Sequence, residues 1–177
     1  MDHNIKKSSW FIKAICFNFS ICFFVASFAA TVYLNLWGHV WKDFLKLMVL
    51  PGPLVTDYFM LGNIASAFLN AGICGMTFTL LMIALKTECR PSYFLVVAHC
   101  FYGLNFLNMW PPVLGILLFT KIFKIGFRHN LDMAMFSTAF GPFISEMLFR
   151  YHVWDYYIAY EVQVSVLGFI YVIIFSI

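Results

Sequence analysis

The sequence carries very little charge. Only 11% of its 177 residues are Asp, Glu, Lys or Arg, whereas an average soluble domain has about 25%. Hydrophobic residues make up 63%, and no segment is polar enough to form a water-soluble domain beside the apolar ones. These values predict an integral membrane protein with the lipid bilayer as its main partner. The net charge of +3 is small and scattered, so it does not indicate a nucleic-acid partner.

The sequence also lacks the motifs of the common enzyme and cofactor-binding families. No GxSxG, HExxH, P-loop or dinucleotide-binding glycine pattern occurs. The five cysteines show no CxxC spacing, which indicates neither a zinc knuckle nor a disulfide framework. Two His-x-x-Asp pairs, His129 with Asp132 and His152 with Asp155, lack the further ligands that a metal ion needs. We therefore expect no catalytic activity, no bound metal and no cofactor.

The sequence instead contains several long apolar runs. A helix that crosses a bilayer needs roughly 20 apolar residues. The sequence therefore predicts an all-α fold, a polytopic transmembrane helical bundle in which some helices are broken by proline or are re-entrant. The whole chain, residues 1–177, is expected to form a single transmembrane domain. The apolar runs lie at residues 14–41, 58–85, 93–120, 133–149 and 158–177.

Basic residues near the N-terminus set the expected orientation. Lys6, Lys7 and Lys13 precede the first apolar run, and the positive-inside rule places such residues in the cytoplasm. A cleaved signal peptide is the alternative, with a small-residue site at residues 27–29, but the apolar run continues well beyond that site. We therefore expect a multi-pass protein of the cell membrane with a cytoplasmic N-terminus.

The run over residues 93–120 is interrupted near its middle by GLNFLNMWPP, in which tandem prolines remove backbone donors. If this run crosses once, the basic loop at residues 121–128 falls on the side opposite to Lys86 and the N-terminus. If the run enters and returns, all of these basic residues share the cytoplasmic side. We prefer the second arrangement, a re-entrant hairpin with residues 105–112 at its tip.

Two proline-containing breaks are similar to each other. Residues 52–57, GPLVTD, and residues 141–146, GPFISE, both read glycine, proline, two apolar residues, a hydroxyl and a carboxylate. Each follows an LNxW sequence, so residues 34–57 and 107–146 form a weak candidate repeat, with chance similarity in an apolar chain as the alternative. In many transporters the substrate site lies where discontinuous helices from two repeats meet.

The hydroxyl and carboxylate of each motif are the first candidates for a solute pathway. An ionisable side chain within a membrane segment is costly and tends to face a cavity or a partner. For Asp57 the alternative is a helix N-cap, in which the side chain accepts hydrogen bonds from free backbone N–H groups. Glu146 lies deeper in an apolar run, so capping explains it less well. The four candidates are Thr56, Asp57, Ser145 and Glu146.

Amide side chains provide the other candidates. Asn63 and Asn70 are one heptad apart, so on a continuous helix they share a face, where they either contact substrate or join helices by hydrogen bonds. Asn105, Asn108 and Trp110 lie beside the tandem prolines, and asparagine both donates and accepts hydrogen bonds. We expect these three residues to line a site for a small polar solute, unless Asn108 only caps the broken backbone.

A set of motifs runs through residues 50–147: PGPLVTDYF, then GN and AFLNAG, then GLNFLNMWPPVLGILLF and FGPFISE. In this order they resemble an uncharacterised family of multi-pass membrane proteins, found mainly in Firmicutes and known as a domain of unknown function. The resemblance implies no substrate and no catalytic residue. Chains of that family are longer and consist of related halves. The resemblance therefore implies that this chain is an N-terminal, truncated half, which pairs with a missing second half or with another copy.

Three functions are open from the sequence. The first is a transporter or channel, or half of one, for a small polar solute or ion, and it predicts that the two Gly-Pro motifs lie close together. The second is a structural or assembly subunit without transport activity, in which the small residues at positions 62–75 pack against a partner chain. The third, and the least supported, is an intramembrane enzyme. The small residues and the few spans also predict a homo-oligomer.

Overall fold

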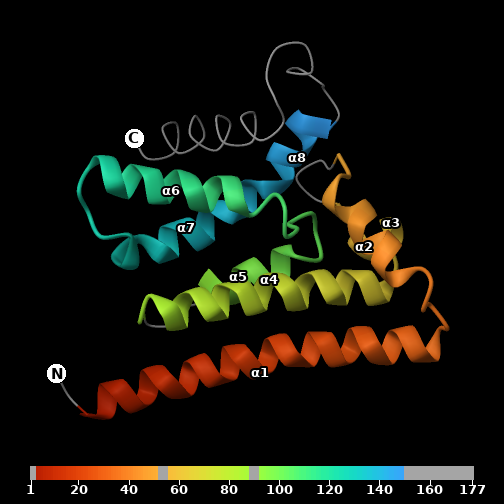
Figure 1. Cartoon of the computed structure of the whole chain (residues 1–177), viewed down its shortest axis with the longest axis horizontal. Coiled ribbons are helices and arrows are strands. Elements are labelled where there is room, and N and C mark those ends of the chain that lie inside the picture. The colour runs from red at the N-terminus through yellow and green to blue at the C-terminus, as the bar shows by residue number, and fades with distance from the viewer. Residues whose placement is uncertain (1–2, 52–55, 88–91, 150–177) are drawn as a thin grey trace.

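The computed structural model of the chain describes residues 3–51, 56–87 and 92–149, and every regular element in these ranges is a helix (Figure 1). This confirms the all-α prediction. The predicted helix at residues 158–177, residues 52–55 of the first Gly-Pro motif and the His152–Asp155 pair lie outside the described residues. In chain order the helices are α1 (His3–Tyr33), α2 (Val40–Met48), α3 (Tyr58–Leu61), α4 (Ile64–Ala84), α5 (Ser92–His99), α6 (Trp110–Ile122), η1 (Phe127–Asn130), α7 (Leu131–Ser137), η2 (Thr138–Phe140) and α8 (Gly141–Phe149).

Two of the described helices are long and apolar enough to cross a membrane. They are Trp10–Tyr33, which is most of α1, and Ile64–Ala84, which is all of α4. Helix α6 is also apolar, but it has 13 residues, fewer than the roughly 20 that a bilayer crossing needs. The described part of the chain thus contains two candidate membrane-spanning helices with shorter helices beside them.

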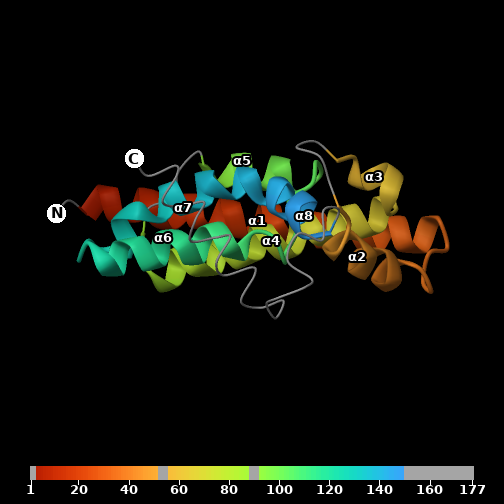
Figure 2. The same ribbon diagram turned by 90° about the horizontal axis from the view of Figure 1, so that it is seen from above.

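Helices α1 and α4 run antiparallel along each other (Figures 1 and 2), and small residues of α4 allow their close approach. A side chain on Gly72 would meet the ring of Phe24 at 3.1 Å, and one on Gly75 would meet Ser20 Oγ at 2.9 Å. Ser20 Oγ also lies 2.8 Å from the hydroxyl of Tyr93, which joins α5 to the pair. The surface of α4 at Gly72 and Gly75 is therefore occupied by α1 of the same chain, together with α5 at Gly75.

The apolar run at residues 58–85 is two helices rather than the one that we expected. Gly62 leaves helical geometry, with φ −105° and ψ −122°, and α3 ends there. Asn63 then starts α4 with a capping box, because Asn63 Oδ1 accepts from Ser66 N (2.8 Å) and Ser66 Oγ accepts from Asn63 N (3.0 Å). Asn63 has an extended backbone, so it does not share a helical face with Asn70, contrary to the expectation from a continuous helix.

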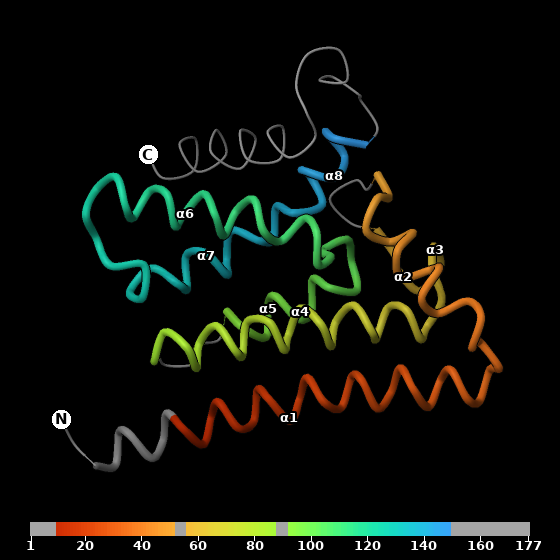
Figure 3. Tube along the Cα trace, viewed as in Figure 1, coloured from red at the N-terminus to blue at the C-terminus, as the bar shows by residue number. Residues whose placement is uncertain are grey.

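Helices α5 and α6 point in opposite directions and are joined by residues 100–109, which we call the central break (Figures 1 and 3). Pro111 and Pro112 occupy the first turn of α6, where the backbone N–H groups have no partner within the helix. The tandem prolines therefore begin a helix instead of interrupting one. After α6 the chain turns back through η1, α7 and η2, and α8 begins against the central break (Figure 3).

The packing of α4 on α1 predicts that Gly75→Val destabilises the protein. The added side chain would overlap Ser20 and Tyr93, and overpacking of this kind costs about 1–3 kcal/mol. We expect a lower thermal unfolding midpoint for the purified protein in detergent, followed by circular dichroism. Gly38→Val is the matched control, because nothing lies within 4 Å of a side chain added at Gly38. Equal midpoints for the two variants would contradict this packing.

Candidate functional site

Residues of both Gly-Pro motifs meet at Gly103, in the central break. Gly103 has φ +116°, a conformation that favours glycine. A Cβ atom at Gly103 would lie 2.9 Å from Pro142 Cγ and 3.5 Å from Thr56 Cβ. A Cβ atom at Gly141 would in turn lie 2.8 Å from Asn108 Oδ1. The described residues of the two motifs therefore contact one segment of the chain.

Two asparagines satisfy the backbone of the central break reciprocally. Asn105 Oδ1 accepts hydrogen bonds from Leu107 N (2.9 Å) and Asn108 N (2.8 Å). Asn108 Oδ1 accepts from Asn105 N at 2.8 Å. Both side chains are buried, with exposed fractions of 0% and 4%. Since a buried N–H group without a partner is costly, these bonds allow the chain to leave helical geometry inside the protein.

The amide N–H groups of the same two residues bind neighbouring helices. Asn105 Nδ2 donates to Leu47 O in α2 and to the Tyr58 hydroxyl in α3, both at 3.0 Å. Asn108 Nδ2 donates to Ser145 Oγ in α8 at 2.8 Å and to Gly103 O at 2.9 Å. The side-chain oxygen of each asparagine thus caps the break, and its side-chain N–H groups bind another helix.

Tyr58 completes the contact between α3 and the central break. Its hydroxyl donates to Gly103 O at 2.7 Å, and its backbone N–H donates to Phe101 O at 3.2 Å. Two residues before Tyr58, Thr56 N also donates to the central break, to Tyr102 O at 3.1 Å. Burial raises the pKa of the Tyr58 phenol well above its usual value, so the hydroxyl is a donor at any physiological pH.

Asn70 fixes the other end of the central break. It is fully buried on α4, and its Nδ2 atom donates to Cys100 O and to Leu104 O, both at 2.9 Å. Both carbonyls belong to the central break, after the end of α5 at His99, where the chain is no longer helical and its C=O groups need other partners. The second of the two roles expected for Asn70, joining segments by hydrogen bonds, is the one that its contacts display.

Asp57 and Asn63 lie on the helix starts and act there as caps. Asp57 is exposed, and its Oδ1 atom accepts from Phe59 N (2.9 Å) and Met60 N (3.3 Å) at the start of α3. Asn63 caps α4 and donates through Nδ2 to Asp43 Oδ2 at 2.6 Å. The capping alternative for Asp57 therefore matches its geometry. The structure does not bring Asp57 into the group of residues buried at the central break, which we call the buried cluster: Thr56, Tyr58, Gly103, Asn105, Asn108 and Ser145.

Trp110 and Glu146 lie at the edge of the buried cluster. Trp110 begins α6 and packs edge-to-face on Phe106, with ring centroids 5.9 Å apart. Glu146 follows Ser145 in α8; the residue is partly buried and its Oε2 atom is shielded from solvent. The cavity beside Asn108 and Ser145 has a volume of only about 10 Å³. This is room for about one water molecule.

The two LNxW sequences of the candidate repeat have different local structures. Asn35 has φ +51° in the turn after α1, where Leu36 N donates to Thr31 O at 2.9 Å and closes the helix. Asn108 instead lies before α6 and is buried. The repeat stays a prediction, because most of its first Gly-Pro motif lies outside the described residues.

Two residues of the cluster were not among the candidates from sequence. Tyr58 directly follows Asp57, and Gly103 begins the interrupted segment of the 93–120 run. A phenol beside a helix start and a glycine at the beginning of a break are weak signals, because both are common in apolar helical segments. Among the described residues, no group of three His, Cys, Asp or Glu side chains is placed to hold a metal ion.

These features define an all-helical protein with two candidate membrane-spanning helices and a buried polar cluster around a helix break. A family model described as "Protein of unknown function (DUF1576)" matches residues 37–176, and the chain belongs to this family. This confirms the resemblance to an uncharacterised family. No curated protein and no solved structure matches the chain. The family gives no function, so a function has to be inferred from the site.

The contacts at Gly103 predict that Gly103→Ala is strongly destabilising. The alanine would be strained at φ +116° and its Cβ atom would overlap Pro142, which together cost about 2–4 kcal/mol. We expect a clear loss of stability in chemical unfolding of the purified protein. Gly126→Ala is the control, since its Cβ atom would meet only the exposed His129 ring, at 3.3 Å. Similar stabilities for both variants would show that Gly103 is not constrained as described.

The central break also predicts that Asn105→Ala destabilises the protein more than Asn18→Ala does. Asn105→Ala removes the acceptor for the buried Asn108 N–H and for the partly buried Leu107 N–H, and a buried group left without a partner costs about 1–3 kcal/mol. Asn18 is exposed, so its truncation should cost little. Unfolding midpoints measured side by side in the same detergent provide the comparison, and equal losses would be inconsistent with the capping role of Asn105.

Proposed function

We propose that the chain is an integral membrane protein that forms a transporter or channel, or half of one, for a small polar solute or ion. The observation that carries the proposal is the meeting of Thr56, Pro142 and Ser145 at the central break, between short helices and beside two candidate spans. Broken helices occur at membrane depth only where protein or a watery cavity satisfies the backbone. Transporters use such discontinuous helices to build their binding sites.

The proposed placement in the membrane follows from the basic loops. Arg128 Nη2 donates to Lys86 O, so the loop after α6 lies against the loop after α4. The N-terminus of α1 lies at the same end of the bundle (Figure 1). Under the positive-inside rule this end is cytoplasmic. With α1 and α4 as spans, α5, the central break and α6 then form a re-entrant hairpin in the cell membrane.

The conformation described here corresponds to a closed pathway. Asn108 and Ser145 are joined at 2.8 Å, and the cavity beside them admits about one water molecule. Separation of α8 from the central break would open this cavity and would expose Glu146, the neighbour of Ser145. The two candidate spans among the described residues do not enclose a pathway, so we further propose that a second copy or a second half of the protein completes it.

A specific observation favours the alternative, a structural or assembly subunit without transport. Asn70, Asn105 and Asn108 use their side-chain amides within the chain, and Asp57 caps α3. In this interpretation the polar cluster only stabilises a broken helix, and no solute ever contacts it. The two functions differ in whether the protein makes a membrane permeable.

Reconstitution into liposomes distinguishes the two functions. We expect the purified chain to raise permeability to at least one of three probes: urea and glycerol, followed by stopped-flow light scattering, and K⁺, followed with an enclosed indicator dye. If K⁺ is conducted, Glu146→Gln should lower its flux about tenfold, the effect of losing about 1.4 kcal/mol of attraction to the cation.

Asp132→Asn is the control, because Asp132 lies in the first turn of α7, outside both the central break and α8, and accepts a hydrogen bond from Ser92 Oγ at 2.6 Å. Liposomes with folded, inserted protein that are no more permeable than empty liposomes to all three probes would contradict the transport proposal. That result would favour the assembly subunit.

A further inference from the structure

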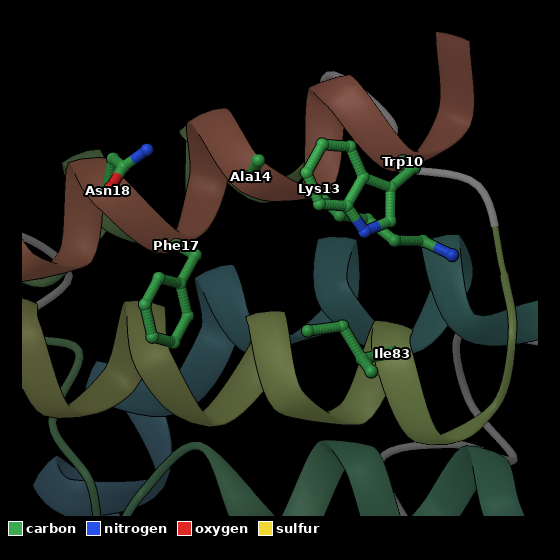
Figure 4. Close-up of a pocket in the computed structure, with 6 residues that line it drawn as sticks. All are labelled: Trp10, Lys13, Ala14, Phe17, Asn18 and Ile83. Carbon is green, nitrogen blue, oxygen red and sulfur yellow. The ribbon is translucent and has the colours of Figure 1, made fainter. Parts of the chain in front are cut away.

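A groove on the outer surface lies between α1 and α4, at the end of the bundle where α1 begins and α4 ends. Its volume is about 310 Å³, within the range of about 300–1,000 Å³ that is usual for small-ligand sites. It shares no residue with the cluster around the central break. The groove is lined by Trp10, Lys13, Ala14, Phe17, Asn18 and Ile83 (Figure 4).

The walls of the groove are apolar. The Phe17 ring extends from α1 toward α4, and Ile83 lies on the last full turn of α4 facing the same space (Figure 4). Ala14 lies between Phe17 and Trp10 on α1, and its small side chain leaves the space that larger residues would fill. Trp10 is 71% exposed and Ile83 is 47% exposed. In a membrane, such exposed apolar walls face acyl chains instead of water.

One end of the groove is basic and lies at the membrane interface. The candidate span of α1 begins at Trp10, and the Lys13 side chain comes from the same stretch of α1, with its ammonium extending beyond the Trp10 indole (Figure 4). Tryptophan and lysine are the residues that anchor helices at the level of the lipid headgroups. The turn after α4, the last turn of α6 and the residues that follow α6 bring further cations to this end of the bundle: Lys86, Lys121, Lys124 and Arg128.

We propose that this groove binds an anionic phospholipid of the cytoplasmic leaflet. Its acyl chain lies along Phe17 and Ile83, and its phosphate accepts hydrogen bonds from Lys13 Nζ and the Trp10 indole N–H. The apolar walls suit the chain, and the positive charge at the interfacial end selects an anionic headgroup over a zwitterionic one. The inference rests on the proposed membrane placement, and it is independent of whether the protein transports a solute.

Quenching of Trp10 fluorescence by brominated lipids tests the proposal. The protein is reconstituted into phosphatidylcholine vesicles that contain either brominated phosphatidylglycerol or brominated phosphatidylcholine. The signal of Trp10 is the difference between the wild type and Trp10→Phe, which removes the contribution of the other tryptophans. We expect phosphatidylglycerol to be preferred about fivefold, the factor that corresponds to about 1 kcal/mol per basic residue near an anionic headgroup.

Lys13→Gln should abolish this preference, whereas Lys42→Gln should leave it unchanged. Lys42 is an exposed lysine on α2, at the opposite end of α1, so it controls for general attraction of anionic lipid to the protein. Equal quenching of Trp10 by the two lipids, or equal effects of the two lysine variants, would overturn the lipid site while leaving the membrane placement intact. Quenching by neither lipid would overturn the membrane placement and the lipid site together.

Discussion

The reciprocal hydrogen bonds between Asn105 and Asn108 are the interaction on which the rest of the structure depends. They supply acceptors for the N–H groups of Asn105, Leu107 and Asn108, which have left helical geometry inside the protein. Each such group would cost about 1–3 kcal/mol if it were buried without a partner. Because their side chains also bind Leu47, Tyr58 and Ser145, the residues that cap the break also position α2, α3 and α8 around it.

The close approach of these helices requires small residues where they meet. Gly103 leaves room for Thr56 and Pro142, and Gly141 leaves room for Asn108. A polar cluster packed this tightly is stable when closed, which explains why the cavity beside Ser145 is so small. In the proposed function, α8 would have two positions, one in contact with the central break and one separated from it. Discrete alternatives of this kind are what a gated pathway uses.

The sequence predicts the broad architecture because its strongest signals are local. Low charge and long apolar runs predict helices, and the interrupted segment at residues 103–112 predicts a break between two of them. The same signals fail at Gly62, because a lone glycine in an apolar run looks like one more small packing residue. The start of a new helix could have been predicted from Asn63 and Ser66, since Asn-x-x-Ser at a helix start is close to the usual capping-box pattern.

The candidate site was predictable only in part. Asn105 and Asn108 were singled out because they lie beside the tandem prolines, and Ser145 because it is the hydroxyl residue of the second Gly-Pro motif; the structure joins all three. The contacts of Tyr58 with Gly103, and of Asn105 with Leu47, link residues 45 and 58 positions apart in the chain. Contacts over such separations depend on how the helices pack, and neither periodicity nor composition encodes that.

The coupling free energy between Asn108 and Ser145 tests the central claim most directly. It is obtained from the unfolding free energies of the wild type, Asn108→Ala, Ser145→Ala and the double variant in one detergent. Contacting residues that share a buried hydrogen bond should couple by about 0.5–3 kcal/mol. The pair Asn108 and Thr77 should be additive, because Thr77 bonds only within α4, to Ile73 O. Additive effects for Asn108 and Ser145 would contradict the account, since α8 would then not be held on the central break.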